Sequence, residues 1–444
     1  MAKVLRNAIL VDVDPIGVEP GSLRIDGGCI ADRDAHVDPR PGDEDVDCAG
    51  AVVMPGLINA HAHLYSALAA GMPPPPTPPA NFREILEHIW WRLDRALDAE
   101  SIATSARIGG LDALRCGTTT LIDHHASPEC IARSLDFIEQ GVADVGLRAV
   151  LCYETTDRNG QAGRRAGIDE NRRYLAKCRE ARDGRFAALA GAHAAFTLED
   201  EALDALSALA DEFATGVHIH VAEDPCDERY CRQRYGTSLI DRLADYGILR
   251  PESIFAHGTH LDTGAVARVN EVGTAVAHNP RSNMNNAVGY ASVTAYRCPV
   301  LLGTDGIGSD MFAEARYAWF KARDAGAGIT PDDVLGMLAA SARRASVALG
   351  VTLGKLDVGA AADVVITDYR PATPLTGDNL GGHFIFGMGS HHVKDVIING
   401  RWAMRDRVIV NCDEPAMRRH AVPVASALWT RMASVECQRT APSQ

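Results

Sequence analysis

Two histidines, His61 and His63, stand two residues apart directly after the apolar stretch 51–59. Because side chains i and i+2 of a β-strand point to the same face, both imidazoles could reach one cation if this stretch is a strand. A single histidine at a strand end is often a polar residue of the core, whereas a His-x-His pair is typical of a metal site. The pair therefore predicts a metal centre at the end of a strand.

Four further apolar runs downstream also end in groups that can bind metal or move protons. They end at His220 with Glu223 three residues later, at His257, at His278 and at Asp305. Each run is short and is closed by Gly, Pro or Asn, which is typical of buried parallel strands. Polar residues at the carboxyl ends of successive parallel strands are typical of the (β/α)8 barrel, whose active site lies on that face.

Helical patterns separate these runs, at 101–114, 199–213 and 330–349. The second has leucines at three-residue spacing, and the third opens with a Thr-Pro pair that is typical of a helix start. The alternation of strands and helices covers residues 55–353, which is sufficient for a barrel of about 250 residues. We therefore predict an α/β protein whose main domain is a (β/α)8 TIM-like barrel.

The two ends of the chain have a different pattern. Residues 1–54 and 354–412 contain short alternating strands separated by Gly and Asp turns. Neither segment is large enough for a core of its own, so we expect one small β-sandwich composed of both. Residues 413–444 are predicted to form a helical tail, packed on the barrel or on a neighbouring subunit.

The composition excludes several classes of protein. Of the 444 residues, 46% are apolar and 23% are charged, as in ordinary globular proteins. The net charge of −14 argues against a nucleic-acid or anionic membrane partner. The chain shows neither a membrane-spanning apolar run nor a signal peptide, so we expect a cytoplasmic protein. The eleven cysteines include no Cys-x-x-Cys pair, which favours reduced thiols over disulfides or a cysteine zinc site.

A proline-rich stretch at 72–79 precedes an expected helix at 81–91 that carries Trp90 and Trp91. One interpretation is a stiff loop that holds an aromatic lid over the site. The alternative is a polyproline connector whose tryptophans pack on the barrel. An aromatic side chain such as Trp90 at the mouth would suit a flat heterocyclic substrate.

Five motifs occur in a fixed order: Pro55-Gly-Leu-Ile-Asn-Ala-His61-Ala-His63, His220-Val-Ala-Glu223, Ala256-His257-Gly-Thr-His-Leu261, His278-Asn-Pro-Arg-Ser-Asn283 and Gly303-Thr-Asp305-Gly306. In this order they resemble the amidohydrolase superfamily and, more narrowly, its cytosine deaminase and chlorohydrolase branch. The resemblance runs from about residue 20 to residue 410. Residues 118–128 and 81–94 further resemble aminohydrolases of the SsnA type.

The resemblance implies one divalent ion per subunit, zinc in most members and iron in some, held by His61, His63, His220 and Asp305. By spacing alone His218 could replace His220, because both project from one strand face. The His-x-x-Glu step to Glu223 favours His220. Other members hold two ions with a carboxylated lysine, but none of the five lysines lies at the end of a predicted barrel strand, which favours a single ion.

The chemistry of such a centre is hydrolysis. A metal ion can lower the pKa of bound water enough to supply hydroxide near neutral pH, and Asp305 beside it can accept the proton. The resemblance implies that Glu223 protonates a ring nitrogen and that His257 orients the attacked group. A glutamate at a helix start also has a purely structural role in many proteins.

Four other residues are candidates for contact with the substrate: His193, Arg158, His125 and Trp90. His193 matches a substrate-contacting position of the branch, although the usual Pro-His-x-Pro-Tyr neighbours are replaced here. Arg158 could bind a substrate anion or be a solvated loop residue, and His125 could reach the site or pack in the core. His278 is expected to support the site from behind, whereas His124 and His260 are expected to be structural.

Three classes of function follow. The leading hypothesis is hydrolytic deamination of an amino-substituted nitrogen heterocycle, of purine, pterin, pyrimidine or triazine type, with release of ammonia. The second is hydrolysis of a cyclic amide or displacement of another leaving group, as in imidazolone hydrolases and chlorohydrolases. The third, a non-catalytic barrel, conflicts with the complete ligand set. The acidic chain favours a neutral or singly charged small molecule, and relatives are usually homodimers, so we expect a homodimer or higher homo-oligomer.

Overall fold

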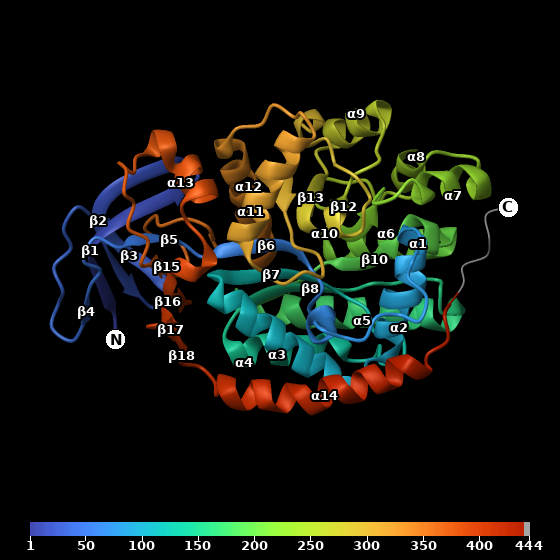
Figure 1. Cartoon of the computed structure of the whole chain (residues 1–444), viewed down its shortest axis with the longest axis horizontal. Coiled ribbons are helices and arrows are strands. Elements are labelled where there is room, and N and C mark those ends of the chain that lie inside the picture. The colour runs from blue at the N-terminus through green and yellow to red at the C-terminus, as the bar shows by residue number, and fades with distance from the viewer. Residues whose placement is uncertain (439–444) are drawn as a thin grey trace.

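The computed structural model describes residues 1–438, and within them parallel strands form a barrel surrounded by helices (Figure 1). The barrel strands are β6 (Leu57–Ala62), β7 (Thr118–His125), β8 (Arg148–Tyr153), β9 (Phe186–Ala188) with β10 (Ala190–Ala194), β11 (Val217–Val221), β12 (Ile254–His257), β13 (Ala275–His278) and β14 (Val300–Leu302). β9 and β10 follow one another directly and together occupy one strand position. The predicted (β/α)8 barrel is therefore confirmed.

The barrel is closed by two parallel bridges between its sheets. One sheet has the order β6-β7-β8-β9 and the other β10-β11-β12-β13-β14. Thr155 pairs with Ala192 at one seam, and Ala62 pairs with Asp305 at the other. At the second seam a Cβ on Gly303 would lie 2.7 Å from Cβ of His61, so only glycine allows the two strands to come this close.

Helices cover the outside of the barrel. They are α3 (Ala99–Arg115), α4 (Ser134–Val145), α5 (Gly160–Ala181), α6 (Asp200–Phe213), α7 (Cys226–Tyr235), α8 (Leu239–Asp245), α9 (Thr263–Val272), α10 (Pro280–Asn285), α11 (Met311–Asp324) and α12 (Pro331–Leu349). The predicted helices at 101–114, 199–213 and 330–349 correspond to α3, α6 and α12. Thr330 caps α12 in a capping box with Asp333, as its sequence indicated.

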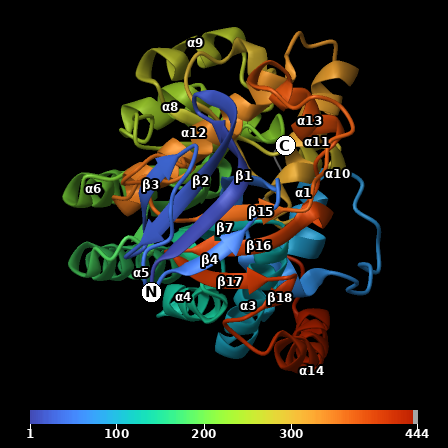
Figure 2. The same cartoon turned by 90° about the vertical axis from the view of Figure 1, so that its left-hand side faces the viewer.

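The strands of both chain ends form one nine-stranded sheet beside the barrel, seen face on in Figure 2. They are β1 (Lys3–Val13), β2 (Ile16–Asp26), β3 (Cys29–Asp34), β4 (Glu44–Asp47), β5 (Val52–Pro55), β15 (Val364–Thr367), β16 (Val393–Ile398), β17 (Arg401–Arg405) and β18 (Val408–Ile409). β5 joins the two halves, because it pairs with β1 and with β15. Leu23 of β2 and Ile397 of β16 share one apolar cluster, so the sheet curls over a core of its own.

Shorter elements complete the described part of the chain. Between β6 and α3 lie η1 (Leu64–Ala69), α1 (Phe82–Ile85), one π-helical turn η2 (Leu86–Trp90) and α2 (Trp91–Ala96). The others are η3 (Ala195–Thr197), η4 (Val293–Ala295), η5 (Gly377–Asn379), α13 (Leu380–Phe386), η6 (Ser390–His392) and α14 (Glu414–Ser434). α14 runs along the outside of α2 and α3 (Figure 1). The last six residues of the predicted tail, 439–444, lie outside the described residues.

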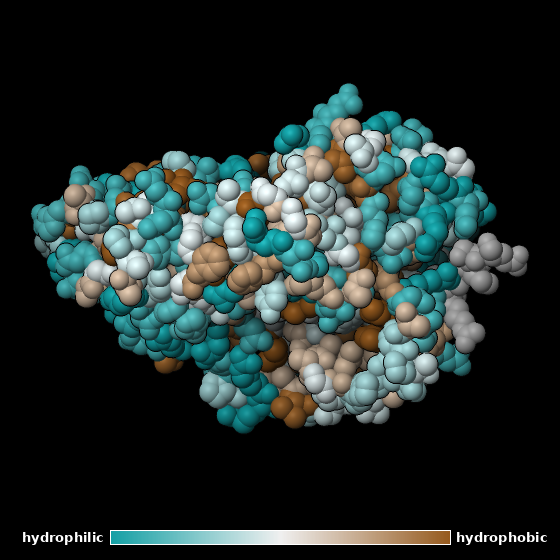
Figure 3. Space-filling model, turned by 45° about the horizontal axis from the view of Figure 1, so that its top comes forward, coloured by the Kyte–Doolittle hydropathy of each residue, from teal (hydrophilic) through white to brown (hydrophobic). Residues whose placement is uncertain are grey.

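The surface is mostly hydrophilic on the face shown in Figure 3, and apolar residues gather in a hollow of that face. None of the helices in residues 1–438 is both long and apolar enough to cross a membrane.

A buried ion pair links the barrel to the terminal sheet. Arg148, at the start of β8, donates from Nε to Asp363 Oδ2 at 2.8 Å and from Nη2 to Oδ1 at 3.0 Å. Both side chains are 2% exposed, so neither charge has water to replace its partner. The bidentate geometry makes this contact between the two parts of the fold specific in direction.

We expect Arg148→Met to destabilise the protein by about 3–5 kcal/mol, because it leaves the Asp363 carboxylate buried and unpaired. The double variant Arg148→Met/Asp363→Leu should recover most of this loss. The midpoint of urea unfolding measures both effects. Glu212→Gln, which breaks the exposed pair with Arg172, is the matched control and should cost at most about 1 kcal/mol. A single Arg148 variant as stable as this control would contradict the assignment.

Candidate active site and metal centre

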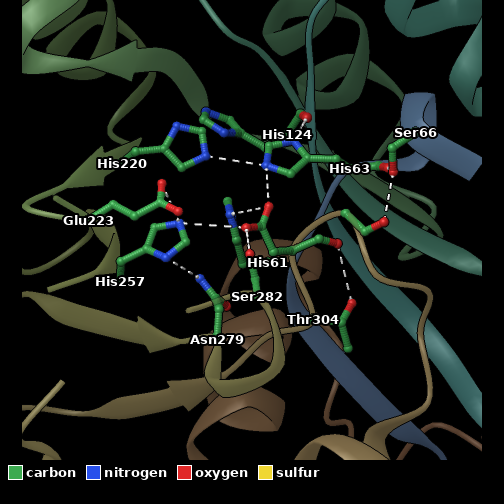
Figure 4. Close-up of polar contacts among 12 residues, drawn as sticks. His61, His63, Ser66, His124, His220, Glu223, His257, Asn279, Ser282 and Thr304 are labelled. Atoms are coloured by element: carbon green, nitrogen blue, oxygen red, sulfur yellow. Dashed lines mark hydrogen bonds and ion pairs between the residues drawn. The ribbon is translucent and has the colours of Figure 1, made fainter. Parts of the chain in front are cut away.

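Four side chains from three barrel strand ends converge at the carboxyl face of the barrel, and Figure 4 shows the three histidines among them. His61 lies in β6 and His63 directly follows it, His220 lies in β11, and Asp305 follows β14. His63 Nε2 is 2.8 Å from Asp305 Oδ1 and 3.2 Å from His220 Nε2. His61 Nε2 is 3.7 Å from the same Asp305 oxygen. The four predicted ligands therefore lie together.

The orientation of the rings is set by hydrogen bonds from the nitrogens that face away from this point. His63 Nδ1 donates to the backbone carbonyl of His124 at 2.6 Å, and His220 Nδ1 donates to that of His193 at 2.8 Å. A carbonyl can only accept, so each Nδ1 carries a proton. Each Nε2 is then the nitrogen that can bind a cation, which on His63 takes the place of a second proton.

His61 completes the set. Its Nδ1 lies 2.9 Å from Nε2 of His218, and its own Nε2 is buried without a hydrogen-bond partner in the described structure. His218 thus stands behind His61, which leaves His220 as the histidine of this strand at the centre. Three imidazole nitrogens and one carboxylate oxygen are a typical donor set for zinc and related ions, so these residues fit a divalent metal.

The electrostatics of the site also favour a cation. Burial lowers the pKa of His61 well below its usual value and that of His220 to about 4, so both rings are neutral. Burial would likewise lower the pKa of His63, but the carboxylates of Asp305 and Glu154 outweigh it and raise that pKa well above the usual value. A positive charge is therefore stabilised between His63 and Asp305.

The backbone turns sharply at the ends of three strands around the centre. Ala222, His257 and Asp305 have φ values of 50°, 77° and 56°, in the left-handed region that residues other than glycine rarely adopt. Such conformations persist only where the surrounding structure imposes them, and they cluster at functional sites. Here they turn the side chains of His257 and Asp305 inward.

Glu223 and His257 lie beside the four donors. His257 Nε2 is 3.4 Å from Glu223 Oε2 and 3.8 Å from Asp305 Oδ2. His257 Nδ1 donates to the side-chain oxygen of Asn283 at 2.8 Å, and Asn286 donates to Glu223 Oε1 at 3.1 Å. A neutral imidazole and a carboxyl group thus face the same space as the metal donors.

The segment around α10 supplies supports that sequence reasoning did not assign. Ser282 Oγ donates to Asp305 Oδ2, while Asn283 and Asn286 hold His257 and Glu223. Ser282 and Asn283 lie in the motif that begins at His278, so their place in the sequence was visible. The side chains that they contact, Asp305 and His257, could not be assigned as partners from the sequence, because these lie at the ends of other strands.

Glu154 was also missed. It follows β8 directly, lines the cavity, and places Oε1 3.2 Å from His63 Nδ1 and 3.5 Å from His124 Nδ1. The signal that could have found it was available, because it is a carboxylate at the carboxyl end of a predicted strand.

The cavity in front of the centre has an apolar wall and a polar floor. The wall consists of Phe82, Leu86, Trp90 and Trp91, all from the segment between β6 and α3. The floor includes His63, His220, Glu223 and Asp305, and His193 also lines it. Of the residues predicted to contact substrate, Trp90 and His193 therefore face the cavity.

Arg158 and His125 do not line it. Arg158 is buried behind the wall, 2.8 Å from Asp94 and with its guanidinium 4.5 Å from the centre of the Trp91 ring. His125 Nε2 contacts the Ser127 hydroxyl at 2.9 Å in the core. The positions of Arg158 and His125 therefore do not support the prediction that these side chains contact the substrate.

The remaining histidines occupy supporting positions. His278 is buried beside His257 without a hydrogen-bond partner in the described residues. His124 Nε2 donates to the carbonyl of His218 at 3.1 Å, and His260 Nε2 donates to that of Val288 at 2.6 Å.

Comparison with known proteins assigns the family. Residues 52–403 match the amidohydrolase family. The chain belongs to this family. It is 31% identical to a 5-methylthioadenosine/S-adenosylhomocysteine deaminase of Halobacterium salinarum, over 91% of this chain and 95% of the relative. It is 28% identical to a 5'-deoxyadenosine deaminase of Methanosarcina mazei, over 97% and 99%.

Two solved structures share the whole fold. An adenosine deaminase from Xanthomonas campestris with bound zinc superimposes with a TM-score of 0.83 at 24% identity, covering 98% of this chain and 99% of the other. The atrazine chlorohydrolase of Arthrobacter aurescens, in complex with zinc, gives 0.79 at 20% identity, covering 96% and 100%. The fold and family expected from the motifs are confirmed, and this amidohydrolase is a hydrolytic enzyme that acts on C–N bonds.

The geometry predicts about one divalent metal ion per chain, because the two four-donor groups in residues 1–438 share His61 and His220, one adding His63 and the other Asp305, so these donors surround one point. Elemental analysis of the purified protein measures the ratio. His61→Ala/His63→Ala should lose the ion, whereas the control His260→Ala should keep it. A ratio near two, or an ion retained in the double variant, would contradict the mononuclear assignment.

Proposed function

We propose that this amidohydrolase removes an amino group hydrolytically from an amino-substituted nitrogen heterocycle and releases ammonia. The observation that supports this most is the position of Glu223, which lines the cavity within 3.4 Å of His257 and beside the metal donors. A carboxyl group there can protonate a ring nitrogen while the adjacent carbon is attacked.

His61, His63, His220 and Asp305 would hold the ion, and a bound divalent ion supplies a Lewis acid that lowers the pKa of water to near neutrality. Asp305 is well placed to accept the proton of that water. Burial alone would raise its pKa, but the facing His63 and His61 hold the pKa well below the usual range, so the carboxylate is ionised.

Glu223 has the opposite tendency. Burial and the neighbouring Asp305 carboxylate raise the pKa of Glu223 well above its usual value, which favours the protonated carboxyl group. In the proposed reaction Glu223 gives this proton to the ring nitrogen as the oxygen of water adds to the carbon. Asp305 returns the proton taken from water to the amino group, which leaves as ammonia, and the remaining proton of the added hydroxyl passes to Glu223 as the carbonyl forms, which restores the acid. His257, neutral and fixed by Asn283, orients the attacked carbon.

The similar proteins support this choice of reaction. The two relatives are named as deaminases of adenine nucleosides, and we extend from them only the reaction and the heterocyclic class of substrate. The aromatic wall formed by Phe82, Trp90 and Trp91 suits a flat ring. Zinc is our proposal for the ion, with iron as the alternative. The homodimer and the cytoplasmic location stay predictions.

Glu223→Gln should lower turnover by at least about 100-fold with the metal content unchanged, because the amide cannot deliver the proton. Steady-state ammonia release and elemental analysis of the same preparation measure the two quantities. The control Glu212→Gln changes an exposed glutamate on α6 and should leave both unchanged. Loss of metal from Glu223→Gln would make Glu223 a ligand and would require a new ligand set.

Metal-loaded protein should release ammonia from at least one member of a panel of amino-purines, adenine nucleosides, amino-pterins, amino-pyrimidines and amino-triazines. Each offers an amino-substituted C=N bond whose nitrogen Glu223 could protonate, which plain amides do not offer. A coupled ammonia assay tests the panel. If none reacts while a cyclic amide is opened or a chloro-substituent is displaced, the deaminase proposal is wrong.

A further inference from the structure

His218 is a fully buried histidine that the proposed reaction does not use. It lies on the same face of β11 as His220 but deeper in the barrel, with Nε2 2.9 Å from His61 Nδ1. Its other nitrogen, Nδ1, lies 3.8 Å from the sulfur of Cys152 in β8. The thiol of Cys152 in turn donates to the backbone carbonyl of Asp123 at 3.6 Å. These groups form a chain that starts at a metal donor and ends on a backbone carbonyl.

The carbonyl of Asp123, at the end of this series, determines which atom donates in each of its hydrogen bonds. A carbonyl can only accept, so the proton of the thiol points to Asp123 and the sulfur accepts from His218 Nδ1. His218 Nε2 is then unprotonated and accepts from His61 Nδ1. His61 must therefore carry its proton on Nδ1, and its Nε2 keeps the lone pair that faces Asp305 and His63. Burial raises the pKa of Cys152 well above its usual value, which keeps the thiol protonated as this order requires.

We propose that His218 and Cys152 are positioning residues of the metal centre, which hold His61 in the tautomer and ring orientation that ligation needs. The inference rests on the proposed metal site and not on the identity of the substrate. His63 and His220 reach the same state through backbone carbonyls. For His61 the carbonyl lies two side chains away, so of the three imidazole donors this one has its tautomer set by side chains that a point substitution can remove.

The same residues could in principle bind an ion themselves, since donor atoms of His124, Cys152 and His218 lie within 4.8 Å of one another. Two observations argue against this. The thiol of Cys152 donates to the carbonyl of Asp123, and burial raises the pKa of this thiol well above its usual value, so the thiolate that a metal requires is not formed. A cluster of three donors also falls short of the four that structural zinc sites require.

The test measures the affinity of purified protein for zinc by competition with a chromophoric chelator, in the variants His218→Leu, His218→Gln and Cys152→Ala. His218→Leu removes the acceptor for His61 and should weaken binding by about 10–100-fold. His218→Gln should recover most of this loss, because its amide oxygen can accept the same proton. Cys152→Ala should give an intermediate loss. His260→Gln, a histidine with only a structural contact, should bind as wild type does.

Two further measurements separate positioning from folding. The thermal midpoints of the metal-free variants should stay close to that of the metal-free wild type, whereas the visible ligand-field spectrum of the cobalt-loaded His218→Leu should shift. Wild-type affinity in His218→Leu would overturn the proposal. Two ions in the wild type, one of which is lost in Cys152→Ala, would make the cluster a metal site and overturn it as well. A wild type that binds no ion would overturn both this inference and the metal centre.

Discussion

The seam between the first and the last barrel strand is the constraint on which the site depends. The carbonyl of His61 accepts from the backbone amides of Thr304 at 3.0 Å and Asp305 at 2.9 Å, and this contact closes the barrel. The same contact brings the imidazole of His61 and the carboxylate of Asp305 to one point, although 244 positions separate them in the chain. Gly303 makes the approach feasible, and the left-handed backbone at Asp305 turns its side chain inward. The hydrogen bonds that close the barrel therefore also bring the predicted metal ligands together.

Without a bound cation, a site of this kind lowers the stability of the fold. His61, His63 and His220 are desolvated around one ionised carboxylate, and groups of this kind lower stability unless they are paired or coordinate a metal. The neighbouring Glu223 has a raised pKa, while Asp305 has a lowered one. Two carboxyl groups in one cavity whose pKa values are shifted in opposite directions can act as the acid and the base of one reaction.

Local rules in the sequence were sufficient for the barrel and for the candidate residues at its strand ends, and the family resemblance added the choice of His220, Glu223 and Asp305 among them. The two-residue period places His61 and His63 on one face, and polar residues at strand ends lie on one side of a parallel barrel. Contacts across the fold were not visible. Arg158 was predicted either to bind a substrate anion or to be a solvated loop residue, because its partner Asp94 lies 64 positions away. His218 matched His220 in spacing, and only its 2.9 Å contact with Nδ1 of His61 shows that it lies behind the centre.

The central claim is that three Nε2 atoms and one carboxylate oxygen hold a single ion. X-ray absorption spectroscopy of the zinc-loaded protein tests it most directly, since nitrogen, oxygen and sulfur neighbours give different distances. The account predicts a first shell of nitrogen and oxygen at about 2.0–2.2 Å, with the multiple scattering of imidazole rings and no sulfur. A sulfur neighbour at about 2.3 Å would place the ion at Cys152 instead and would contradict the assignment.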